Sequence, residues 1–187
     1  MGAVFEHLGY RVFHGPFRGI ENDPMNFNMD SFLRDSGPVD DLLESYDAFQ
    51  DYPFMYCYPY IAEKFPDAKF ILTERDPQRV AESDMNMWLK LGKPKEDIPP
   101  VEVFVERYNN HHSEVLRYFE SSERLLRLTV GKEQDLSALC TFLGHAPNAV
   151  NAWPQRNQGT YGVRGWLANR YWPLHMRLIR LRDRVFR

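Results

Sequence analysis

Arg75 and Ser83, eight positions apart, form the part of this sequence best suited to binding a phosphate group. Arg75 follows a short apolar run, residues 70–72, which is typical of a strand covered on both faces. Asp76 and Pro77 then mark a helix start, with the proline near the first helical position. An arginine at the carboxyl end of a parallel strand points into the crevice where open α/β sheets bind ligands, and its planar guanidinium suits phosphate oxygens. The alternative is an exposed arginine at an ordinary strand–helix turn and a solvated helix serine.

A second candidate side chain is the carboxylate of Asp51, which follows an expected strand over residues 47–50. It should emerge at the same carboxyl edge of the sheet as Arg75. There it could act as a general base, provided that partial burial raises its pKa. It could equally cap the helix that Pro53 is expected to begin, and the two roles are compatible.

The elements that must position these residues alternate between strand and helix along the chain. This alternation predicts the α/β class, with a parallel sheet flanked by helices and joined by right-handed crossovers. A loop over residues 14–38 and a Pro- and Lys-rich linker over residues 92–100 separate some of the elements. We expect Gly9 to end the first helix, and Asp135 to be the N-cap of the last one, which ends at Gly144. The expected strands cover residues 10–13, 47–50, 69–74 and 124–130, and the expected helices residues 2–8, 39–46, 53–64, 77–90, 101–121 and 135–144.

The segment from residue 69 to residue 83 resembles the second nucleotide-binding element of sulfotransferases that use 3'-phosphoadenylyl sulfate. In that family a strand ends in Arg-Asp/Asn-Pro, a serine follows eight residues after the arginine, and both residues hold the 3'-phosphate. The resemblance implies a P-loop sulfotransferase-like α/β domain over residues 1–160, with Arg75 and Ser83 binding the cofactor. Residues 51–53, 65–73, 139–144, 153–154 and 157 resemble the branch of small bacterial and eukaryotic sulfotransferase-like proteins.

The same resemblance implies roles for three further residues. Cytosolic sulfotransferases carry a Thr-His-Leu-Pro segment in the place of residues 50–53, and its histidine activates the acceptor; here Asp51 takes that place. Arg156 and Gly159 lie in a segment similar to the Arg-Lys-Gly segment that closes over the 3'-phosphate. An arginine beside an accessible backbone turn can hold an anion through side-chain and main-chain donors together.

The first nucleotide-binding element of that family has no counterpart in the printed sequence. In the family a strand and a Gly-rich phosphate loop precede the helix that corresponds to residues 2–8, and no such loop occurs elsewhere in this chain. That strand would be central in a phosphate-loop fold, so its loss would leave strand edges unpaired. We therefore expect the first strand and the phosphate loop to be missing or truncated. The sequence would then be a fragment, a chain whose start is placed too late, or a variant without the loop.

Composition and charge narrow the class of protein. A chain of 187 residues with 43% hydrophobic residues is long enough for one domain with a substantial core. The net charge of −3 argues against a nucleic-acid binder with a globally basic surface. Cys57 and Cys140 are expected to be small core residues rather than a disulfide, which favours a reducing compartment and predicts a cytoplasmic protein. No apolar run is long enough to suggest a membrane span or a signal segment.

Residues 161–187 predict a basic amphipathic helix, in which arginines alternate with aromatic and aliphatic residues. Such a helix could contact a membrane surface or a protein partner, so that the protein would be peripheral to a membrane. Alternatively, it packs its apolar face on the domain. The arginines of its helical part are Arg170, Arg177, Arg180, Arg182, Arg184 and Arg187.

The histidines offer no metal site. His111 and His112 are adjacent in an expected helix and point about 100° apart, so they cannot ligate one metal together. We expect a structural hydrogen bond for His112. His14 either lines an acceptor pocket or is a solvated turn histidine. Side chains of the long loop and of the segment after Ser83 could line the acceptor pocket, and their apolar and aromatic character favours an apolar or aromatic acceptor. They are Phe17, Phe27, Met85, Met87 and Trp88.

Two functions follow from the resemblance. The first is transfer of a sulfuryl group from 3'-phosphoadenylyl sulfate, as co-substrate, to a hydroxyl or amine of a small-molecule acceptor. The second is a catalytically inactive relative that acts as a nucleotide-binding or membrane- or partner-interaction module. A nucleotide kinase ranks last, because the sequence has neither a phosphate loop nor an acidic pair suited to magnesium.

Overall fold

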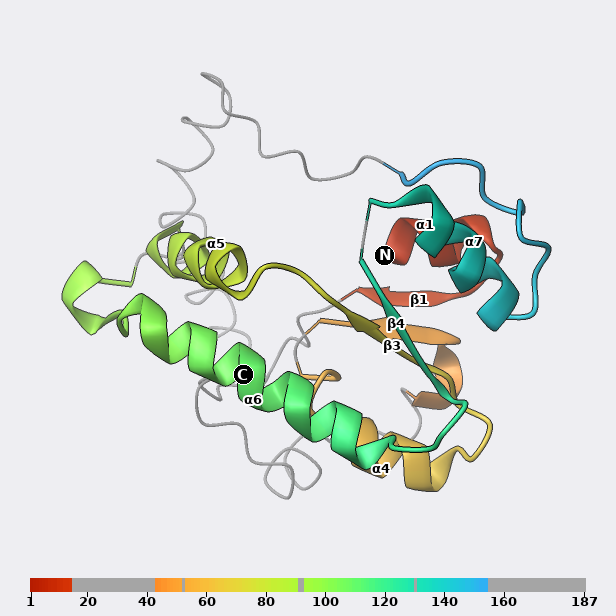
Figure 1. Cartoon of the computed structure of the whole chain (residues 1–187), viewed down its shortest axis with the longest axis horizontal. Coiled ribbons are helices and arrows are strands. Elements are labelled where there is room, and N and C mark those ends of the chain that lie inside the picture. The colour runs from red at the N-terminus through yellow and green to blue at the C-terminus, as the bar shows by residue number, and fades with distance from the viewer. Residues whose placement is uncertain (15–42, 52, 91–92, 130, 155–187) are drawn as a thin grey trace, which may run out of the picture. The chain divides into compact units, whose positions relative to one another are not determined.

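Strands and helices alternate along the chain as the sequence predicts (Figure 1). The computed structural model describes residues 1–14, 43–51, 53–90, 93–129 and 131–154. The elements are α1 (Gly2–His7), β1 (Val12–His14), β2 (Ala48–Gln50), α4 (Tyr58–Lys64), β3 (Phe70–Thr73), α5 (Pro77–Lys90), the 3₁₀ turn η2 (Lys95–Asp97), α6 (Val101–Tyr118), β4 (Leu125–Leu128) and α7 (Glu133–Phe142).

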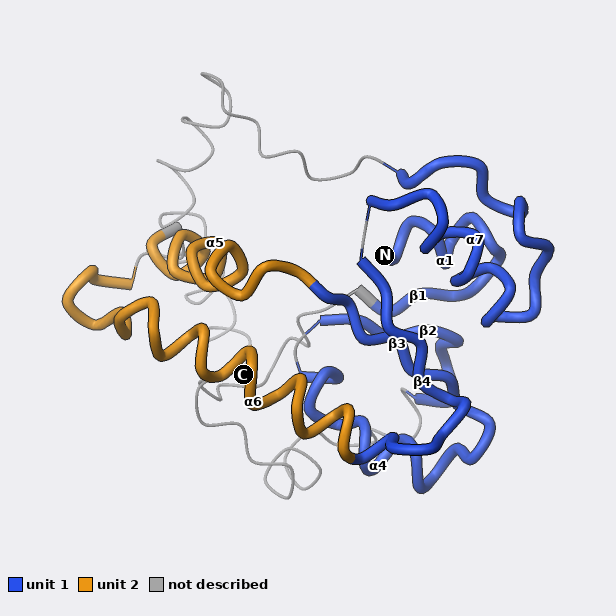
Figure 2. Tube along the Cα trace, in the orientation of Figure 1, with its two compact units in different colours: residues 1–74, 118–154 blue, residues 75–117, 155–187 orange. Residues whose placement is uncertain are grey.

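The chain divides into two compact units (Figure 2). Unit 1 comprises residues 1–74 and 118–154, and unit 2 comprises residues 75–117 and 155–187. All described strands belong to unit 1, together with α1, α4 and α7. Unit 2 contains α5 and almost all of α6.

The strands of unit 1 are parallel, which confirms the predicted α/β class. β1 pairs with β2, so that Val12 lies opposite Ala48, and β3 pairs with β4, so that Phe70 lies opposite Leu125. Each pair forms its own two-stranded sheet in the part of the chain that the structure describes, whereas strand–helix alternation predicts one sheet. Each strand has only three or four residues, so each ladder is short.

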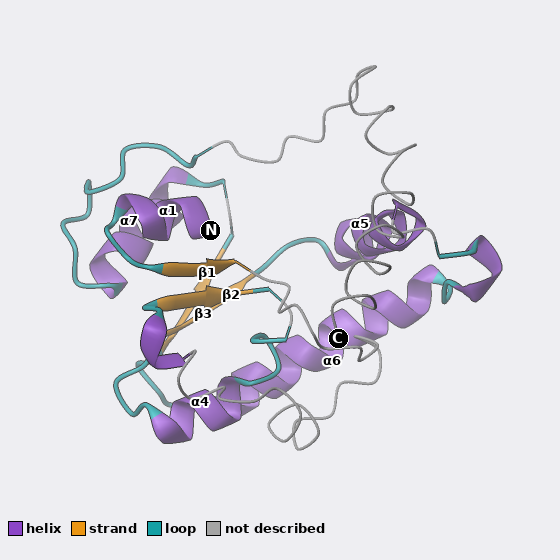
Figure 3. Ribbon diagram, turned by 180° about the vertical axis from the view of Figure 1, so that it is seen from behind, coloured by secondary structure: helices purple, strands orange, loops and turns teal. Residues whose placement is uncertain are grey.

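Helices cover both faces of the β1–β2 pair. Val12 and Ala48 pack with the main core cluster, whereas Phe13 and Phe49 pack with a second cluster, as period-two alternation requires. Figures 1 and 3 show α1 and α7 on one side of these strands and α4 on the other. The buried residues of the main cluster come from α1, β4, α7 and the segment after α7: Val4, Phe5, Leu128, Leu136, Leu139, Cys140 and Val150. The buried residues of the second cluster are Leu43, Phe54 and Cys57.

Both cysteines are free and buried, as expected for small core residues. Cys140 belongs to the main cluster and Cys57 to the second. Burial raises the pKa of the Cys57 thiol to about 12, because a thiolate loses its hydration there. A thiol in such a place behaves as a small hydrophobic group rather than as a nucleophile.

Two helices end at the glycines that the sequence predicts as their stops. Gly9 has a φ of +90° after α1, and Gly144 has a φ of +87° after α7, so both take the left-handed conformation that ends helices. Ser121 also has a positive φ, of +64°, and the predicted helix to residue 121 already ends at Tyr118. Gly9 and Gly144 therefore end α1 and α7 through backbone conformation.

Two predicted helix starts are wrong. Pro53 does not begin a helix: residues 53–56 form turns, and α4 starts at Tyr58 with Cys57 as its N-cap. The reason is Pro59, which is tolerated in the first turn of α4 but would have broken a helix that began at Pro53. The N-cap of α7 is Lys132 rather than Asp135, which lies in the first turn of that helix.

Candidate functional site

The corner between β3 and α5 is built by local sequence. The backbone N–H of Glu74 donates to the carbonyl of Leu128 at 2.8 Å, which extends the β3–β4 ladder one residue beyond the strand. At the helix side, Asp76 Oδ1 accepts a hydrogen bond from the backbone N–H of Arg79 at 2.9 Å. Asp76 is thus the side-chain cap of α5, with Pro77 as its first residue, as the sequence predicts. Arg75 is the residue between the end of the ladder and the cap.

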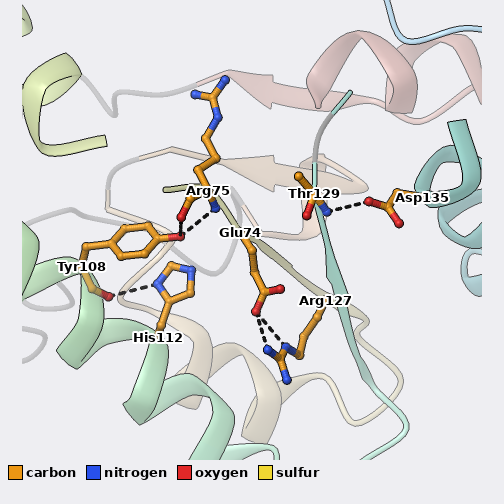
Figure 4. Close-up of polar contacts among 7 residues, drawn as sticks. All are labelled: Glu74, Arg75, Tyr108, His112, Arg127, Thr129 and Asp135. Atoms are coloured by element: carbon orange, nitrogen blue, oxygen red, sulfur yellow. Dashed lines mark hydrogen bonds and ion pairs between the residues drawn. The ribbon is translucent and has the colours of Figure 1, made fainter. Parts of the chain in front are cut away.

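The guanidinium of Arg75 is exposed and has no hydrogen-bond or ion-pair partner among the described residues. Figure 4 shows it pointing away from the ring of Tyr108. Two other arginines in the described ranges form ion pairs: Arg11 with Asp47 at 2.8 Å and Arg127 with Glu74 at 2.7 Å. Arg75 therefore retains its full capacity to bind an anion.

The backbone of Arg75 is held by a residue far away in sequence. Its N–H donates to the hydroxyl of Tyr108 at 2.9 Å, and the same hydroxyl donates to the Arg75 carbonyl at 3.1 Å (Figure 4). His112 lies one turn further along α6, with Nδ1 3.0 Å from the Tyr108 carbonyl and its ring 3.9 Å from the Tyr108 ring, centroid to centroid. This contact confirms the structural hydrogen bond expected for His112. Sequence reasoning missed Tyr108, because no local pattern marks a partner 33 residues away.

Ser83 lies on α5 in the same unit as Arg75, and its side chain is exposed. Arg79 is four residues before Ser83 on the same helix face and is also exposed. Sequence reasoning missed Arg79, although its spacing to Ser83 was a usable signal. Unit 2 therefore presents two exposed cations, Arg75 and Arg79, and a serine hydroxyl along the start of one helix.

Asp51 belongs to unit 1, whereas Arg75 and Ser83 belong to unit 2. Its side chain is exposed, so the partial burial on which the general-base role depends is not met. Its φ is +66°, a left-handed conformation that aspartate tolerates better than most residues. The alternative role as helix cap is wrong, because α4 begins at Tyr58 and the Asp51 carbonyl instead accepts a turn hydrogen bond from Met55 N–H at 3.4 Å.

A different carboxyl group in unit 2 is perturbed. Asp84 of α5 is half-buried, and burial raises its pKa, while the nearby charge of Arg107 partly opposes that rise. A half-buried carboxyl group with a raised pKa is a candidate acid or base. Sequence reasoning missed Asp84 because its burial depends on how α5 and α6 pack.

Several predicted functional segments lie outside the described residues. They are Arg156 and Gly159, the amphipathic segment 161–187, and the loop residues Phe17 and Phe27. Of the other residues expected near an acceptor, Met87 is exposed, and Trp88 packs edge-on against Phe104 with Lys93 Nζ 3.7 Å from its ring centroid. Within the described ranges, no helix combines the length and the apolar character needed to cross a membrane.

Comparison with family models identifies a domain. A family model described as "Sulfotransferase domain" matches residues 1–103, which is more than half of the 187 residues. The matched range includes Asp51, Arg75, Arg79 and Ser83 but ends before Tyr108. No curated protein matches the chain. The chain belongs to the sulfotransferase-domain family, as the sequence motifs predict.

Proposed function

We propose that this chain transfers a sulfuryl group from 3'-phosphoadenylyl sulfate to a hydroxyl or amine of a small-molecule acceptor. Membership of the sulfotransferase-domain family supports the reaction class. The single observation that carries the donor assignment is the exposed guanidinium of Arg75, which has no partner in the described part of the chain and stands between a strand and a capped helix.

The proposed site for the 3'-phosphate is the start of α5. Arg75 supplies a guanidinium that can donate two parallel hydrogen bonds to phosphate oxygens, and Ser83 supplies a hydroxyl donor. Arg156 and Gly159 are proposed to close over the same phosphate. These donors suit a doubly charged phosphate better than a neutral ligand.

The reaction itself requires little covalent work from the protein. The acceptor oxygen or nitrogen attacks the sulfur, the bond from sulfur to the bridging phosphate oxygen breaks, and adenosine 3',5'-bisphosphate leaves. A base must take the acceptor proton. Asp51 is a candidate for this base only through its place in the family motif, since its side chain is exposed. Asp84 is the second candidate, because its half-buried carboxyl has a raised pKa. Asp51→Asn and Asp84→Asn distinguish the two candidates. The variant that removes the base should have a lower kcat and a pH–rate profile without its acidic limb. The variant that leaves the base intact should have the kcat and the acidic limb of wild type.

The donor site is tested by calorimetry with adenosine 3',5'-bisphosphate on the full chain. Arg75→Ala should weaken binding at least tenfold, because charge-assisted hydrogen bonds contribute about 1.5–3 kcal/mol. Arg117→Ala is a matched control, since Arg117 is exposed, belongs to the same unit and lies in the last turn of α6. Adenosine 5'-monophosphate should bind wild type and Arg75→Ala equally, because it lacks the 3'-phosphate. Unchanged affinity of Arg75→Ala for the bisphosphate would overturn the assignment.

Turnover separates the enzyme from the alternative function, a catalytically inactive nucleotide-binding or membrane- or partner-interaction module. The exposure of Asp51 is the observation that favours this alternative. Formation of adenosine 3',5'-bisphosphate from the phosphosulfate donor, dependent on an added phenol, alcohol or amine, supports the enzyme. Tight bisphosphate binding without turnover across such a panel supports the module. Vesicle flotation of the chain with and without residues 165–187 then tests a membrane contact, and the two free buried cysteines support a cytoplasmic location for either function.

A further inference from the structure

The residue that joins a strand to a helix has backbone groups that neither element satisfies. At Arg75 both groups are satisfied by one side chain: the N–H donates to the Tyr108 hydroxyl at 2.9 Å, and that hydroxyl donates to the carbonyl at 3.1 Å. A phenol can accept and donate at the same time, so the two hydrogen bonds are compatible. The hydroxyl thus bridges the N–H and the carbonyl that flank one Cα atom.

This bridge sets the direction of the Arg75 side chain. Hydrogen bonds on both sides of the Cα restrict φ and ψ, and the direction of the Cα–Cβ bond follows from these two angles. The Arg75 side chain projects from this restrained backbone and is exposed (Figure 4). A cation whose backbone is already ordered loses less conformational freedom on binding an anion, so its affinity is higher.

The position of the bridge argues for orientation rather than for stability. Both hydrogen bonds are solvent-exposed, so water could satisfy the same backbone groups without Tyr108. The net contribution of such exchangeable hydrogen bonds to folding is small. Water would not, however, restrain φ and ψ of Arg75 in the way that a side chain fixed on a helix does.

Tyr108 is itself held in place on α6. His112 lies four residues later, where helical side chains meet, and its ring lies against the Tyr108 ring with an interplanar angle of 30°. The Nδ1 atom of His112 is 3.0 Å from the Tyr108 carbonyl, which restricts the orientation of the imidazole. The stacked imidazole restricts the tyrosine ring in turn, so the hydroxyl is presented to Arg75 by an ordered pair of rings.

We propose that Tyr108 is a positioning residue, which orients Arg75 for the phosphate group through the two backbone hydrogen bonds and is oriented by His112. The proposal rests on the proposed function, because it takes Arg75 as the ligand of the 3'-phosphate. Tyr108 lies beyond the residues that the family model matches.

The test is calorimetry with adenosine 3',5'-bisphosphate on the full chain carrying Tyr108→Phe, which keeps the ring and removes the hydroxyl. Affinity should fall about tenfold, because the backbone of Arg75 would then have to be ordered when the phosphate binds. Tyr118→Phe is the matched control: Tyr118 is on the same helix, is exposed, and its hydroxyl also donates to a backbone carbonyl, that of Pro59 at 3.4 Å. Its affinity should equal that of wild type. Adenosine 5'-monophosphate should bind all three proteins alike.

A double-mutant cycle distinguishes the failure of this inference from the failure of the proposed function. Tyr108→Phe should have no further effect in an Arg75→Ala background, because its action passes through Arg75. If Arg75→Ala alone leaves bisphosphate affinity unchanged, the proposed donor site fails and this inference fails with it. If Arg75→Ala weakens binding but Tyr108→Phe does not, only the positioning role is overturned. An equal loss for both nucleotides, or in both backgrounds, would also overturn it, since it indicates a general structural effect.

His112→Phe provides a second variant that keeps a stacked ring and removes Nδ1. It should weaken bisphosphate binding about threefold, less than Tyr108→Phe, because it removes one indirect support. Melting temperatures of both variants should stay close to that of Tyr118→Phe. If His112→Phe weakens bisphosphate binding further in a Tyr108→Phe background, His112 does not act on Arg75 through Tyr108, and this part of the proposal is overturned.

Discussion

Arg11 and Asp47 form a paired clamp at the start of the β1–β2 ladder. The guanidinium donates to both carboxylate oxygens, at 2.8 Å from Nη2 and 3.0 Å from Nε, and the Arg11 backbone N–H donates to the same carboxylate at 2.8 Å. In return, the Asp47 N–H donates to the Arg11 carbonyl at 2.9 Å. These residues immediately precede Val12 and Ala48, the first pair in register. The clamp therefore sets the alignment of the two strands at their first rung.

This clamp predicts a specific pH dependence of stability. The Arg11 side chain and backbone hold the pKa of Asp47 at about 2, below the value of about 3.9 expected in the unfolded chain. A carboxyl with a depressed folded-state pKa contributes stability above its unfolded pKa and loses it as the pH falls toward the folded one. Asp47→Asn should therefore lower the melting temperature at pH 7, and the difference from wild type should disappear as the pH falls from about 4 to about 2.

The effect should be small and sensitive to salt, because Arg11 and Asp47 are both exposed. About 1 M salt should reduce the difference between Asp47→Asn and wild type at pH 7. Asp67→Asn is a control, since Asp67 is exposed in a turn of the same unit. A difference that persists unchanged at pH 2 would mean that ionisation of Asp47 is not its source.

Asp135 stabilises the segment between β4 and α7. Its carboxylate accepts a hydrogen bond from the Thr129 N–H at 2.9 Å, a backbone group just beyond the strand (Figure 4). Asp135→Ala should lower the free energy of unfolding by about 1–2 kcal/mol, measured by urea denaturation. Glu133→Ala removes an acidic residue from the same first turn of α7 and serves as the control for the helix dipole. Equal losses for the two variants would show that the hydrogen bond to Thr129 contributes nothing.

Leu139 is the side chain whose loss should cost most. It is fully buried in the cluster that joins α1, β4 and α7. Leu139→Ala should lower the free energy of unfolding by about 2–5 kcal/mol, because it removes buried methyl groups and leaves a cavity. Leu89→Ala, on the exposed side of α5, should change it by less than about 0.5 kcal/mol. Similar urea midpoints for the two variants would contradict the assigned core.

Arg79 should contribute a weaker, electrostatic part of anion binding. It is exposed on the same face of α5 as Ser83, and its backbone N–H, rather than its guanidinium, is engaged by Asp76. Arg79→Ala should weaken binding of adenosine 3',5'-bisphosphate about threefold at low salt, as expected for an exposed charge. The loss should shrink at high salt, whereas the loss in Arg75→Ala should persist. Calorimetry at two salt concentrations measures both, and a loss in Arg79→Ala that does not depend on salt would be inconsistent with this role.

The corner that carries Arg75 could be predicted because its determinants are local. The apolar run of β3, the capping side chain of Asp76 and the proline at position 77 act over a few residues, and each stands in the structure as expected. The stops at Gly9 and Gly144 are equally local, since they depend on a single backbone conformation. The helix predicted from Pro53 failed where a second local signal, Pro59, was overlooked.

The sequence by itself determined the class of fold, the helix start at Pro77 and the motifs of the sulfotransferase-domain family, because these depend on neighbouring residues. Only the tertiary structure decided which arginines are engaged. Arg11 and Arg127 pair with carboxylates next to the ends of strands, whereas Arg75 pairs with none among the described residues. It also decided that Tyr108 holds the backbone of Arg75 and that Asp84 is half-buried. Contacts of this kind join residues far apart in sequence, and they exist only once the packing of whole helices and strands has brought those residues together.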